Sequence, residues 1–221
     1  MPNSPSLPIR EVRDSIVEGM AQHNRMVLQA PTGSGKSTQI PQMLLDDGVL
    51  QQGEQVILLQ PRRVAASMLA RRVAYQIRMD KVSGPHTRIQ FVTEGILLRK
   101  ILGDPDLSGV GVLVFDEFHE RNLYTDLTLA LALKTQRERR QDLKIVVMSA
   151  TLDAAPLAEY LKPCATVVTE GRMFPVDIEY SANPAKVRNP QVWDQAAASA
   201  LQVARQADSG DILIFMPGAR E

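Results

Sequence analysis

The sequence predicts an α/β fold in which a mostly parallel sheet is covered by helices on both faces. Apolar runs of strand length alternate with segments whose apolar residues have helical spacing along most of the 221 residues. The runs are nearly continuous in Val, Ile and Leu, which is typical of strands buried on both faces. Polar clusters follow five of these runs, and such positions share one edge of an open parallel sheet. Together these observations indicate βαβ crossovers with a functional site at that edge.

The first predicted strand, residues 26–29, is followed by a glycine-rich loop and then by a helix whose buried face is marked by Ile40 and Leu44. In such a loop the backbone N–H groups and the positive N-terminus of the helix point towards a phosphate. Lys36 is expected to reach the β- and γ-phosphates of a nucleotide, and the Ser37 hydroxyl to contact Mg²⁺. A loop that only joins strand to helix is the alternative, and the Lys-Ser pair disfavours it. The predicted nucleotide-binding residues of this loop are Thr32, Gly33, Ser34, Gly35, Lys36, Ser37 and Thr38.

The second and third predicted strands, residues 55–60 and 88–92, border the most basic part of the chain. Nine basic and two acidic residues lie between Gln60 and Lys100, although the 25 basic and 25 acidic residues of the whole chain balance. Pro61-Arg62-Arg63 follows the second strand, and Thr93 follows the third and precedes a helix over residues 96–101. A helix between the two strands is indicated by apolar spacing over residues 64–73. The basic block can follow a nucleic-acid backbone, with Thr93 bound to a phosphate; solvated helix faces and a helix start are the alternatives.

The fourth predicted strand, residues 110–115, is followed by the adjacent carboxylates Asp116 and Glu117. Adjacent strand residues point to opposite sides, so the two acids are expected to differ in role. Asp116 would hold Mg²⁺ opposite Ser37, and Glu117 would orient and deprotonate the water that attacks the γ-phosphorus. The predicted metal site therefore comprises Ser37, Asp116 and Glu117, and the predicted catalytic residues are Glu117 and Lys36. A strand-ending turn is the alternative, which the phosphate loop upstream disfavours.

Three further polar residues are interpreted as coupling residues near the same edge. His119 is a candidate hydrogen-bonding link and not a metal ligand, because Mg²⁺ prefers oxygen. Ser149 is the last residue of the fifth predicted strand, residues 144–149, and Thr151 comes two residues later. Both could relay hydrolysis to domain motion; helix capping is the alternative. Helices over residues 127–133 and 157–161 and a last strand over residues 166–169 complete this part of the chain.

A composition change near residue 175 predicts a domain boundary. Residues 1–175 are expected to form the first domain and residues 176–221 the incomplete beginning of a second. The second part contains a predicted strand over residues 176–180, an Ala-rich helix over residues 192–207 and an apolar strand over residues 211–216. These few elements cannot bury a core of their own.

Composition excludes several classes of protein. No apolar run approaches the roughly 18 residues of a membrane span, and the N-terminus lacks the regions of a signal peptide. Cys164 is the single cysteine, which excludes an intrachain disulfide and a cysteine-based metal site. We therefore expect a cytoplasmic protein without a membrane partner.

Six segments resemble the motifs of a known enzyme family. Residues 31–42, 60–66, 93–97, 116–121, 149–153 and 212–218 resemble helicase motifs I, Ia, Ib, II, III and IV in order. Their order and spacing resemble the DEAH/RHA family of superfamily 2 ATP-dependent RNA helicases, and so imply a RecA-like P-loop NTPase fold. Phe118 departs from the usual Ala of this family. With the segment over residues 108–111, it resembles the bacterial Hrp-type branch, particularly its B type.

The resemblance implies roles that spacing alone does not show. Arg72 would stack on the nucleotide base, and Arg62 or Arg63, Arg78 and Thr93 would contact the backbone of single-stranded RNA with little sequence preference. ATP or another NTP and Mg²⁺ are the implied cofactors. The segment over residues 71–78 is shorter than in most family members, which leaves the local path of Arg78 open.

The family's motifs V and VI, with their arginine fingers, would lie in the second domain beyond Glu221. The chain alone is therefore expected to bind nucleotide, to hydrolyse it slowly and not to unwind duplexes, with the remainder of the second domain required for full activity. Two alternatives stay open. One is a nucleotide-gated clamp that binds nucleic acid without unwinding it, and the other is a P-loop ATPase that acts on DNA or protein.

Overall fold

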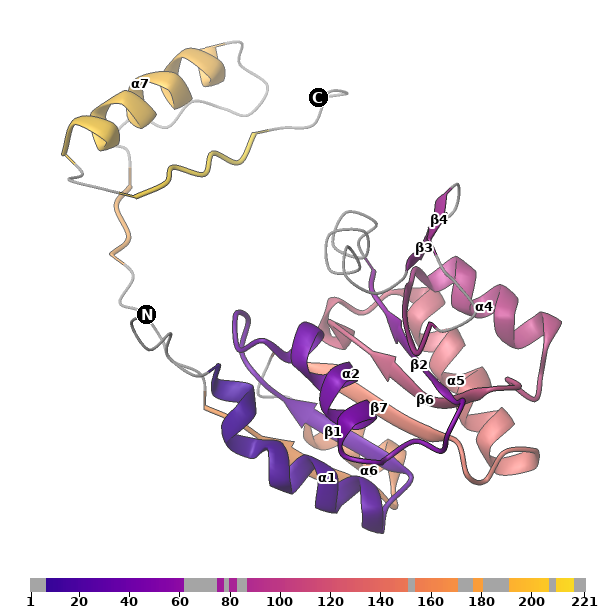
Figure 1. Cartoon of the computed structure of the whole chain (residues 1–221). Coiled ribbons are helices and arrows are strands. Elements are labelled where there is room, and N and C mark those ends of the chain that lie inside the picture. The colour runs from indigo at the N-terminus through magenta and orange to yellow at the C-terminus, as the bar shows by residue number, and fades with distance from the viewer. Residues whose placement is uncertain are drawn as a thin grey trace. The chain divides into compact units, whose positions relative to one another are not determined.

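An eight-stranded sheet organises the larger of the two compact units into which the chain divides, residues Met1–Met173 and Phe174–Glu221 (Figure 1). The computed structural model describes residues 7–61, 75–77, 80–82, 87–150, 154–170, 177–180, 191–206 and 210–216. The strand order is β4-β3-β5-β2-β6-β7-β1-β8, and neighbouring strands are parallel except for the antiparallel pair β3 and β4. The strands are β1 (Arg25–Gln29), β2 (Gln55–Leu59), β3 (Tyr75–Ile77), β4 (Asp80–Val82), β5 (Ile89–Val92), β6 (Val110–Phe115), β7 (Lys144–Ser149) and β8 (Ala165–Val168).

The predicted α/β fold with a mostly parallel sheet is confirmed. All six strands predicted within the first domain are present, and two of them have the predicted bounds, β6 and β7. The pair β3 and β4 was not predicted, because strands of three residues are too short to show a periodic pattern. The helix indicated over residues 64–73 lies outside the described residues.

Helices cover both faces of the sheet (Figure 1). On one face lie the short helix η1 (Pro8–Val12), α1 (Arg13–Gln22) and α2 (Lys36–Asp46). On the other lie α4 (Glu94–Gly103), α5 (Leu123–Glu138) and α6 (Ala155–Leu161). A further short helix, η3 (Phe118–Glu120), follows β6. The helical stripes predicted around Ile40 and over residues 96–101, 127–133 and 157–161 all lie in these helices.

Strand side chains alternate between two buried cores, which explains why the strands are apolar throughout. In β6, Val112 and Val114 pack with the helices of one face, whereas Leu113 and Phe115 pack with those of the other. All six residues of β6 are buried. Burying each large aliphatic side chain contributes roughly 1.5–3 kcal/mol before the entropy cost, so the double cover fixes β6 and the residues that follow it.

Helix α1 is not among the predicted elements, although Ile16 and Met20 carry the i, i+4 spacing of a buried helical face. It packs tightly against the sheet at Gly19. A Cβ atom placed on Gly19 would lie 2.8 Å from Met26 Cε and 2.9 Å from Ala165 Cβ. The absence of a side chain therefore permits the close approach of α1 to β1 and β8.

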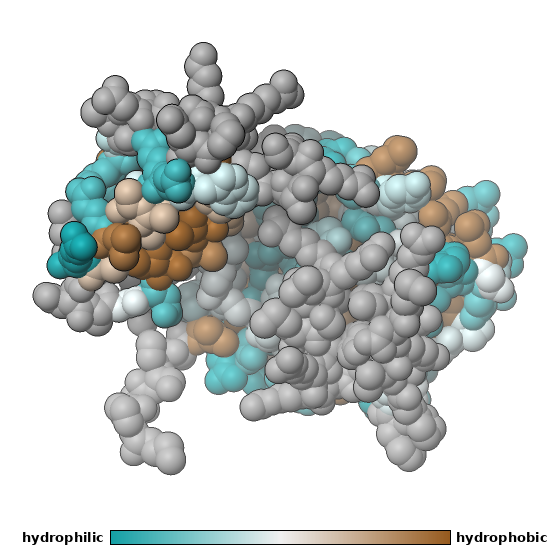
Figure 2. All heavy atoms as spheres, turned by 90° about the horizontal axis from the view of Figure 1, so that it is seen from above, coloured by the Kyte–Doolittle hydropathy of each residue, from teal (hydrophilic) through white to brown (hydrophobic). Residues whose placement is uncertain are grey.

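The smaller unit contains α7 (Gln191–Gln206), close to the helix predicted over residues 192–207. Its described residues 177–180 and 211–216 are not assigned to any strand, because no described neighbour supplies the ladder hydrogen bonds that a strand requires. Apolar side chains are exposed as a result, with Phe215 at 88% and Tyr180 at 89% exposure. Figure 2 shows apolar side chains, in brown, on the surface of the molecule. The assignment of this unit to the start of a second domain stays a prediction.

None of the helices in the described part of the chain combines the length and hydrophobicity of a membrane span.

Candidate active site

The carboxyl ends of β1, β2, β6 and β7 bring the predicted phosphate loop and both adjacent carboxylates to one edge of the sheet. The register pairs Leu59 with Phe115, Phe115 with Val147 and Gln29 with Ser149. The residues that directly follow these strands are therefore neighbours, as the sequence predicts for an open parallel sheet.

The phosphate loop has the backbone of an anion-binding turn. Gly33 and Gly35 adopt φ angles of 79° and 90°, a left-handed region that favours glycine. Gly35 precedes the first residue of α2, whose leading N–H groups have no acceptor within the helix. The Ser34 hydroxyl is buried and has no hydrogen-bond partner among the described residues, so it offers a donor to a ligand. Thr32 and Gly33 are exposed, and the Thr38 hydroxyl donates back to the Gly35 carbonyl oxygen at 3.0 Å.

Asp116 lies under this loop and is almost completely buried, with 1% exposure. The Ser37 hydroxyl donates to Asp116 Oδ2 at 2.5 Å, the Gln60 amide donates to the same oxygen, and the backbone N–H of Glu117 donates to Oδ1 at 2.8 Å. Burial raises the pKa of Asp116, and the hydrogen bond from Ser37 partly opposes that rise. The predicted pairing of Ser37 with Asp116 is therefore present in the geometry.

Gln60 was not predicted as a site residue. It is buried, and it stands beside Asp116 because β2 and β6 are neighbours in register. Its position as the last residue of the second predicted strand is a signal in the sequence. The strand order, which makes that strand the neighbour of β6, is not.

Glu117 faces the lysine of the loop. Lys36 is buried, and its Nζ lies 3.3 Å from Glu117 Oε1. The reason given above for the different directions of the two acids needs correction, because β6 ends at Phe115 and neither acid is part of the strand. Glu117 instead adopts a φ angle of 50°. A non-glycine residue in this left-handed conformation is strained, and such strain is common at functional sites.

His119 connects Glu117 with the segment after β7. Its Nδ1 accepts a hydrogen bond from the backbone N–H of Ala150 at 3.3 Å and lies 3.5 Å from Glu117 Oε2. Since Nδ1 accepts this bond, the proton of the neutral imidazole is assigned to Nε2. Ser149 is buried at the end of β7, and its carbonyl oxygen accepts from Ala30 N–H at 3.0 Å. Thr151 lies outside the described residues.

The oxygen ligands at Asp116 fit Mg²⁺ better than they fit a metal ion that is coordinated by protein side chains alone. Among the described residues, no group of three or more His, Cys, Asp or Glu side chains is placed to hold a metal ion. Mg²⁺ is commonly bound through one or two carboxylates together with substrate phosphates and water. The Asp116 carboxylate and the Ser37 hydroxyl, beside a phosphate loop, match that arrangement.

Of the predicted nucleic-acid contacts, only Thr93 is described. It precedes the first residue of α4 with extended backbone angles, and its side chain makes no capping hydrogen bond. The helix start that was the alternative interpretation is present, because α4 begins at Glu94 and the Thr93 carbonyl oxygen accepts from the N–H groups of Ile96 and Leu97. The Thr93 hydroxyl takes no part in this capping. Arg62, Arg63 and Arg78, and the predicted base-stacking residue Arg72, lie outside the described residues.

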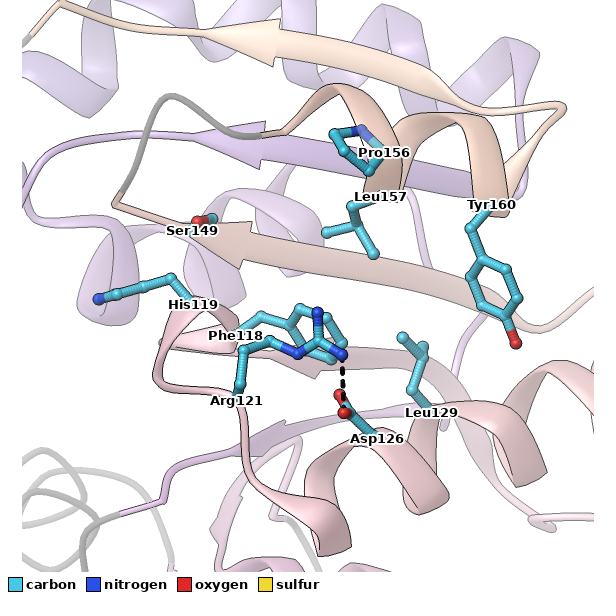
Figure 3. A pocket seen from close by; sticks show the side chains of 9 residues that line it. All are labelled: Phe118, His119, Arg121, Asp126, Leu129, Ser149, Pro156, Leu157 and Tyr160. Carbon is cyan, nitrogen blue, oxygen red and sulfur yellow. Dashed lines mark hydrogen bonds and ion pairs between the residues drawn. The ribbon is translucent and has the colours of Figure 1, made fainter.

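A pocket of about 460 Å³ lies beside the coupling residues, between η3, α5 and α6 (Figure 3). Phe118 is buried in its wall, the Arg121 guanidinium lies 5.6 Å from the centre of the Phe118 ring, and Arg121 pairs with Asp126 at 2.9 Å. The side chains that line this pocket are Phe118, His119, Arg121, Asp126, Leu129, Ser149, Pro156, Leu157 and Tyr160.

Residues 10–159 match the family described as DEAD/DEAH box helicase, and this match spans more than half of the chain. The chain belongs to the DEAD/DEAH box helicase family. The structural elements of this helicase domain that carry the phosphate loop and the adjacent carboxylates all lie inside the matched range.

Relatives of this helicase domain agree with the resemblance stated from its motifs. The chain is 42% identical over 229 aligned positions to the ATP-dependent RNA helicase HrpB of Escherichia coli, covering 98% of this chain and 27% of that protein. It is 33% identical to the pre-mRNA-splicing factor ATP-dependent RNA helicase DEAH10 of Arabidopsis thaliana, covering 98% of this chain and 37% of that protein. The chain thus spans between about a quarter and two fifths of the length of these relatives.

Solved structures give the same assignment. The crystal structure of the E. coli DEAH/RHA helicase HrpB matches with a TM-score of 0.86 and 41% identity, over 97% of this chain and 28% of that one. A second structure, of the E. coli DExH-box NTPase HrpB, matches with a TM-score of 0.78 and 39% identity, over 100% of this chain and 28% of that one. The RecA-like α/β fold and the likeness to the bacterial B-type branch, both expected from the motifs, are confirmed.

Proposed function

We propose that this chain is a motor fragment of an ATP-dependent RNA helicase of the DEAH type, which binds and hydrolyses NTP with Mg²⁺ and binds single-stranded RNA through its backbone. The observation that carries the proposal is the meeting of four side chains at one sheet edge. Ser37 Oγ lies 2.5 Å from Asp116 Oδ2, and Lys36 Nζ lies 3.3 Å from Glu117 Oε1. The names of the relatives, both ATP-dependent RNA helicases, support the same activity.

Each side chain has a distinct role in this proposal. The loop N–H groups and Lys36 bind the phosphates, while Ser37 and Asp116 hold Mg²⁺, with Glu117 at the edge of the same site. Bound Mg²⁺ would neutralise negative charge on the phosphates. Glu117 leaves Lys36 when phosphate arrives, and it then orients the attacking water and accepts its proton. His119 holds the chain after β7 beside Glu117 through the hydrogen bond that its Nδ1 accepts from the Ala150 N–H.

RNA binding rests on Thr93 and the basic segment around it. The Thr93 hydroxyl, which makes no capping hydrogen bond at the start of α4, can donate to a backbone phosphate, and Arg62, Arg63 and Arg78 are proposed to do the same. Arg72 is proposed to stack on the nucleotide base. Contacts to phosphate carry little sequence information, so we expect binding that depends on salt more than on base sequence.

The test compares two variants in the protein that includes the remainder of the second domain. Glu117→Gln should retain nucleotide affinity and lose turnover, because the amide cannot accept the proton of the attacking water. Lys36→Ala should weaken nucleotide binding itself. The exposed residue Glu138 provides the matched control, and Glu138→Gln should leave both quantities unchanged.

Turnover should be measured with single-stranded RNA, with single-stranded DNA and without polymer. Stimulation by RNA above DNA supports the proposed substrate, and stimulation by DNA alone points to the DNA-dependent alternative. If Glu117→Gln hydrolysed NTP at the normal rate, Glu117 would not be the base.

A further inference from the structure

A second polar pocket, of about 390 Å³, lies at the edge of the sheet opposite the phosphate loop. It is formed around the start of β1 and the end of α5, whereas the phosphate loop follows the end of β1. The residues that line it include Arg25, Arg137, His23, Gln22 and Gln141. The described residues that line it include no carboxylate.

Arg25 is held in one position by neutral acceptors. Its Nε donates to Gln136 Oε1 at 2.6 Å, and its Nη1 donates to the carbonyl oxygens of Leu161 and Lys162 at 3.2 Å and 3.0 Å. Gln136 is itself fixed, because its buried amide donates to the carbonyl oxygens of Asn24 and Leu143. The Arg25 Nη2 group has no hydrogen-bond partner among the described residues, so one side of a preorganised guanidinium stays available.

The positive charge of the pocket has no counterion within the described part of the chain. Neither Arg25 nor Arg137 lies within 4.0 Å of a described carboxylate, and the nearby Lys162 pairs with Glu159 at 2.5 Å. Partial burial and the like charge of Arg137 lower the pKa of Arg25. Two guanidinium groups that repel each other in a half-open polar cavity favour an anion between them.

We propose that this pocket binds a phosphate group, either as a free anion or as part of a nucleic-acid backbone. A phosphate carries up to two negative charges and accepts hydrogen bonds on several oxygens, which matches the available Nη2 group of Arg25, the Arg137 guanidinium and neutral amides. The site is independent of the nucleotide site, since it uses the amino end of β1 and none of the residues of the phosphate loop.

The test follows the pocket directly during a titration of the full chain with inorganic phosphate. The side-chain Nε–H signal of Arg25 should shift and saturate in NMR spectra. Arg137→Gln should weaken this binding at least about tenfold, because one charged donor is lost. Arg137 is exposed and makes no ion pair with a described residue, so this variant should remain folded.

Two controls separate the pocket from other effects. Arg139→Gln removes the same charge from the residue that directly follows α5, outside the pocket, and should leave phosphate binding unchanged. Lys36→Ala removes the lysine of the phosphate loop and should also leave the Arg25 titration unchanged. If Arg137→Gln and Arg139→Gln weakened phosphate binding equally, the cause would be the net charge of the protein, and the proposal would be overturned.

A second arm uses single-stranded RNA without terminal phosphates. If Arg137→Gln also weakens RNA binding and lowers its salt dependence by about one phosphate contact, the bound group belongs to a nucleic-acid backbone. If only the inorganic phosphate titration is lost, the site takes a free anion. A pocket that responds to neither ligand, or only to a glutamate-rich peptide, would overturn the proposal.

Discussion

At the scale of single residues, the site depends on how a buried carboxylate is oriented. Asp116 accepts hydrogen bonds from Ser37, from Gln60 and from the backbone N–H of Glu117. In the proposed Mg²⁺ site the Ser37 oxygen must face the metal ion. Ser37 would therefore exchange its hydrogen bond to Asp116 for a contact with the metal. Gln60 has no such second role, and its buried amide can keep Asp116 in place while Ser37 changes partner.

We therefore predict that Gln60→Ala weakens Mg²⁺-dependent nucleotide binding by roughly tenfold, as losses of groups that orient a metal ligand commonly do. Binding of a fluorescent nucleotide, titrated with Mg²⁺, measures the effect. Gln51→Ala is the control, because Gln51 is exposed and precedes the amino end of β2, whereas the site follows the carboxyl end of this strand. Unchanged Mg²⁺ dependence in Gln60→Ala would show that Asp116 needs no support from β2.

The contribution of Gln60 also shows which part of the site the sequence can predict. Lys36, Ser37, Asp116 and Glu117 were predicted because each lies in a local motif whose chemistry is evident from adjacent residues. Gln60 acts only because β2 is the neighbour of β6, and strand order depends on tertiary packing. The left-handed backbone of Glu117 was missed for a similar reason, since nothing in the local sequence requires it.

At the scale of secondary structure, the fit of α1 onto the sheet depends on Gly19. Placing a methyl group there would bring it to 2.8 Å from Met26 Cε and 2.9 Å from Ala165 Cβ. The Met26 side chain can move, but Ala165 Cβ is fixed to the backbone of β8. Gly19→Ala should therefore destabilise the fold by about 1–2 kcal/mol, although alanine favours a helix more than glycine does.

Chemical denaturation measures this change in the free energy of unfolding. Gly95→Ala is the matched control, because Gly95 is also in a helix and a Cβ atom there would meet no atom within 4 Å. That variant should be neutral or slightly more stable. A Gly19→Ala protein as stable as its Gly95→Ala counterpart would mean that α1 can move away from the sheet at little cost.

A second element-scale prediction concerns the turn between α5 and β7. Arg140 pairs with Asp142 at 2.7 Å and also donates to the carbonyl oxygens of Leu107 and Val110. The hydrogen bond from Arg140 lowers the pKa of Asp142. When the pKa of a carboxyl group is lower in the folded than in the unfolded protein, the group stabilises the fold at pH values above its unfolded-state pKa. This stabilisation is lost as the pH falls through the folded-state pKa.

Asp142→Asn should thus cost less than about 1 kcal/mol at pH 7, because Asp142 is half exposed and the pair is screened by solvent. The difference in the free energy of unfolding between the variant and the unchanged protein should shrink as the pH falls below about 4. Urea denaturation at several pH values measures it. A difference that is constant from pH 7 to pH 3 would exclude the ion pair as its cause.

At the scale of the whole molecule, periodicity predicted the larger unit well because its strands are buried on both faces. The same patterns predicted strands over residues 176–180 and 211–216, which the structure does not pair within the described residues. An apolar run records a tendency to be buried, but pairing also requires a neighbouring strand. The exposed apolar residues of the smaller unit are therefore expected to pack against further chain.

The last prediction follows from the division of the chain into a larger and a smaller unit. Residues 1–221 alone should bind nucleotide with the phosphate loop but turn it over roughly 10³–10⁵-fold more slowly than a protein that also includes motifs V and VI. The reason is electrostatic: Lys36 is the cation that the described residues place at the phosphate loop, and charge on the transferring phosphoryl group needs further arginines. Single-turnover hydrolysis and duplex unwinding, measured for both lengths of chain with saturating single-stranded RNA, test this directly. Efficient RNA-stimulated turnover by residues 1–221 would mean that the first domain supplies its own stabilising charge, and the basic segment that contains Arg62 and Arg78 would then be the place to search for it.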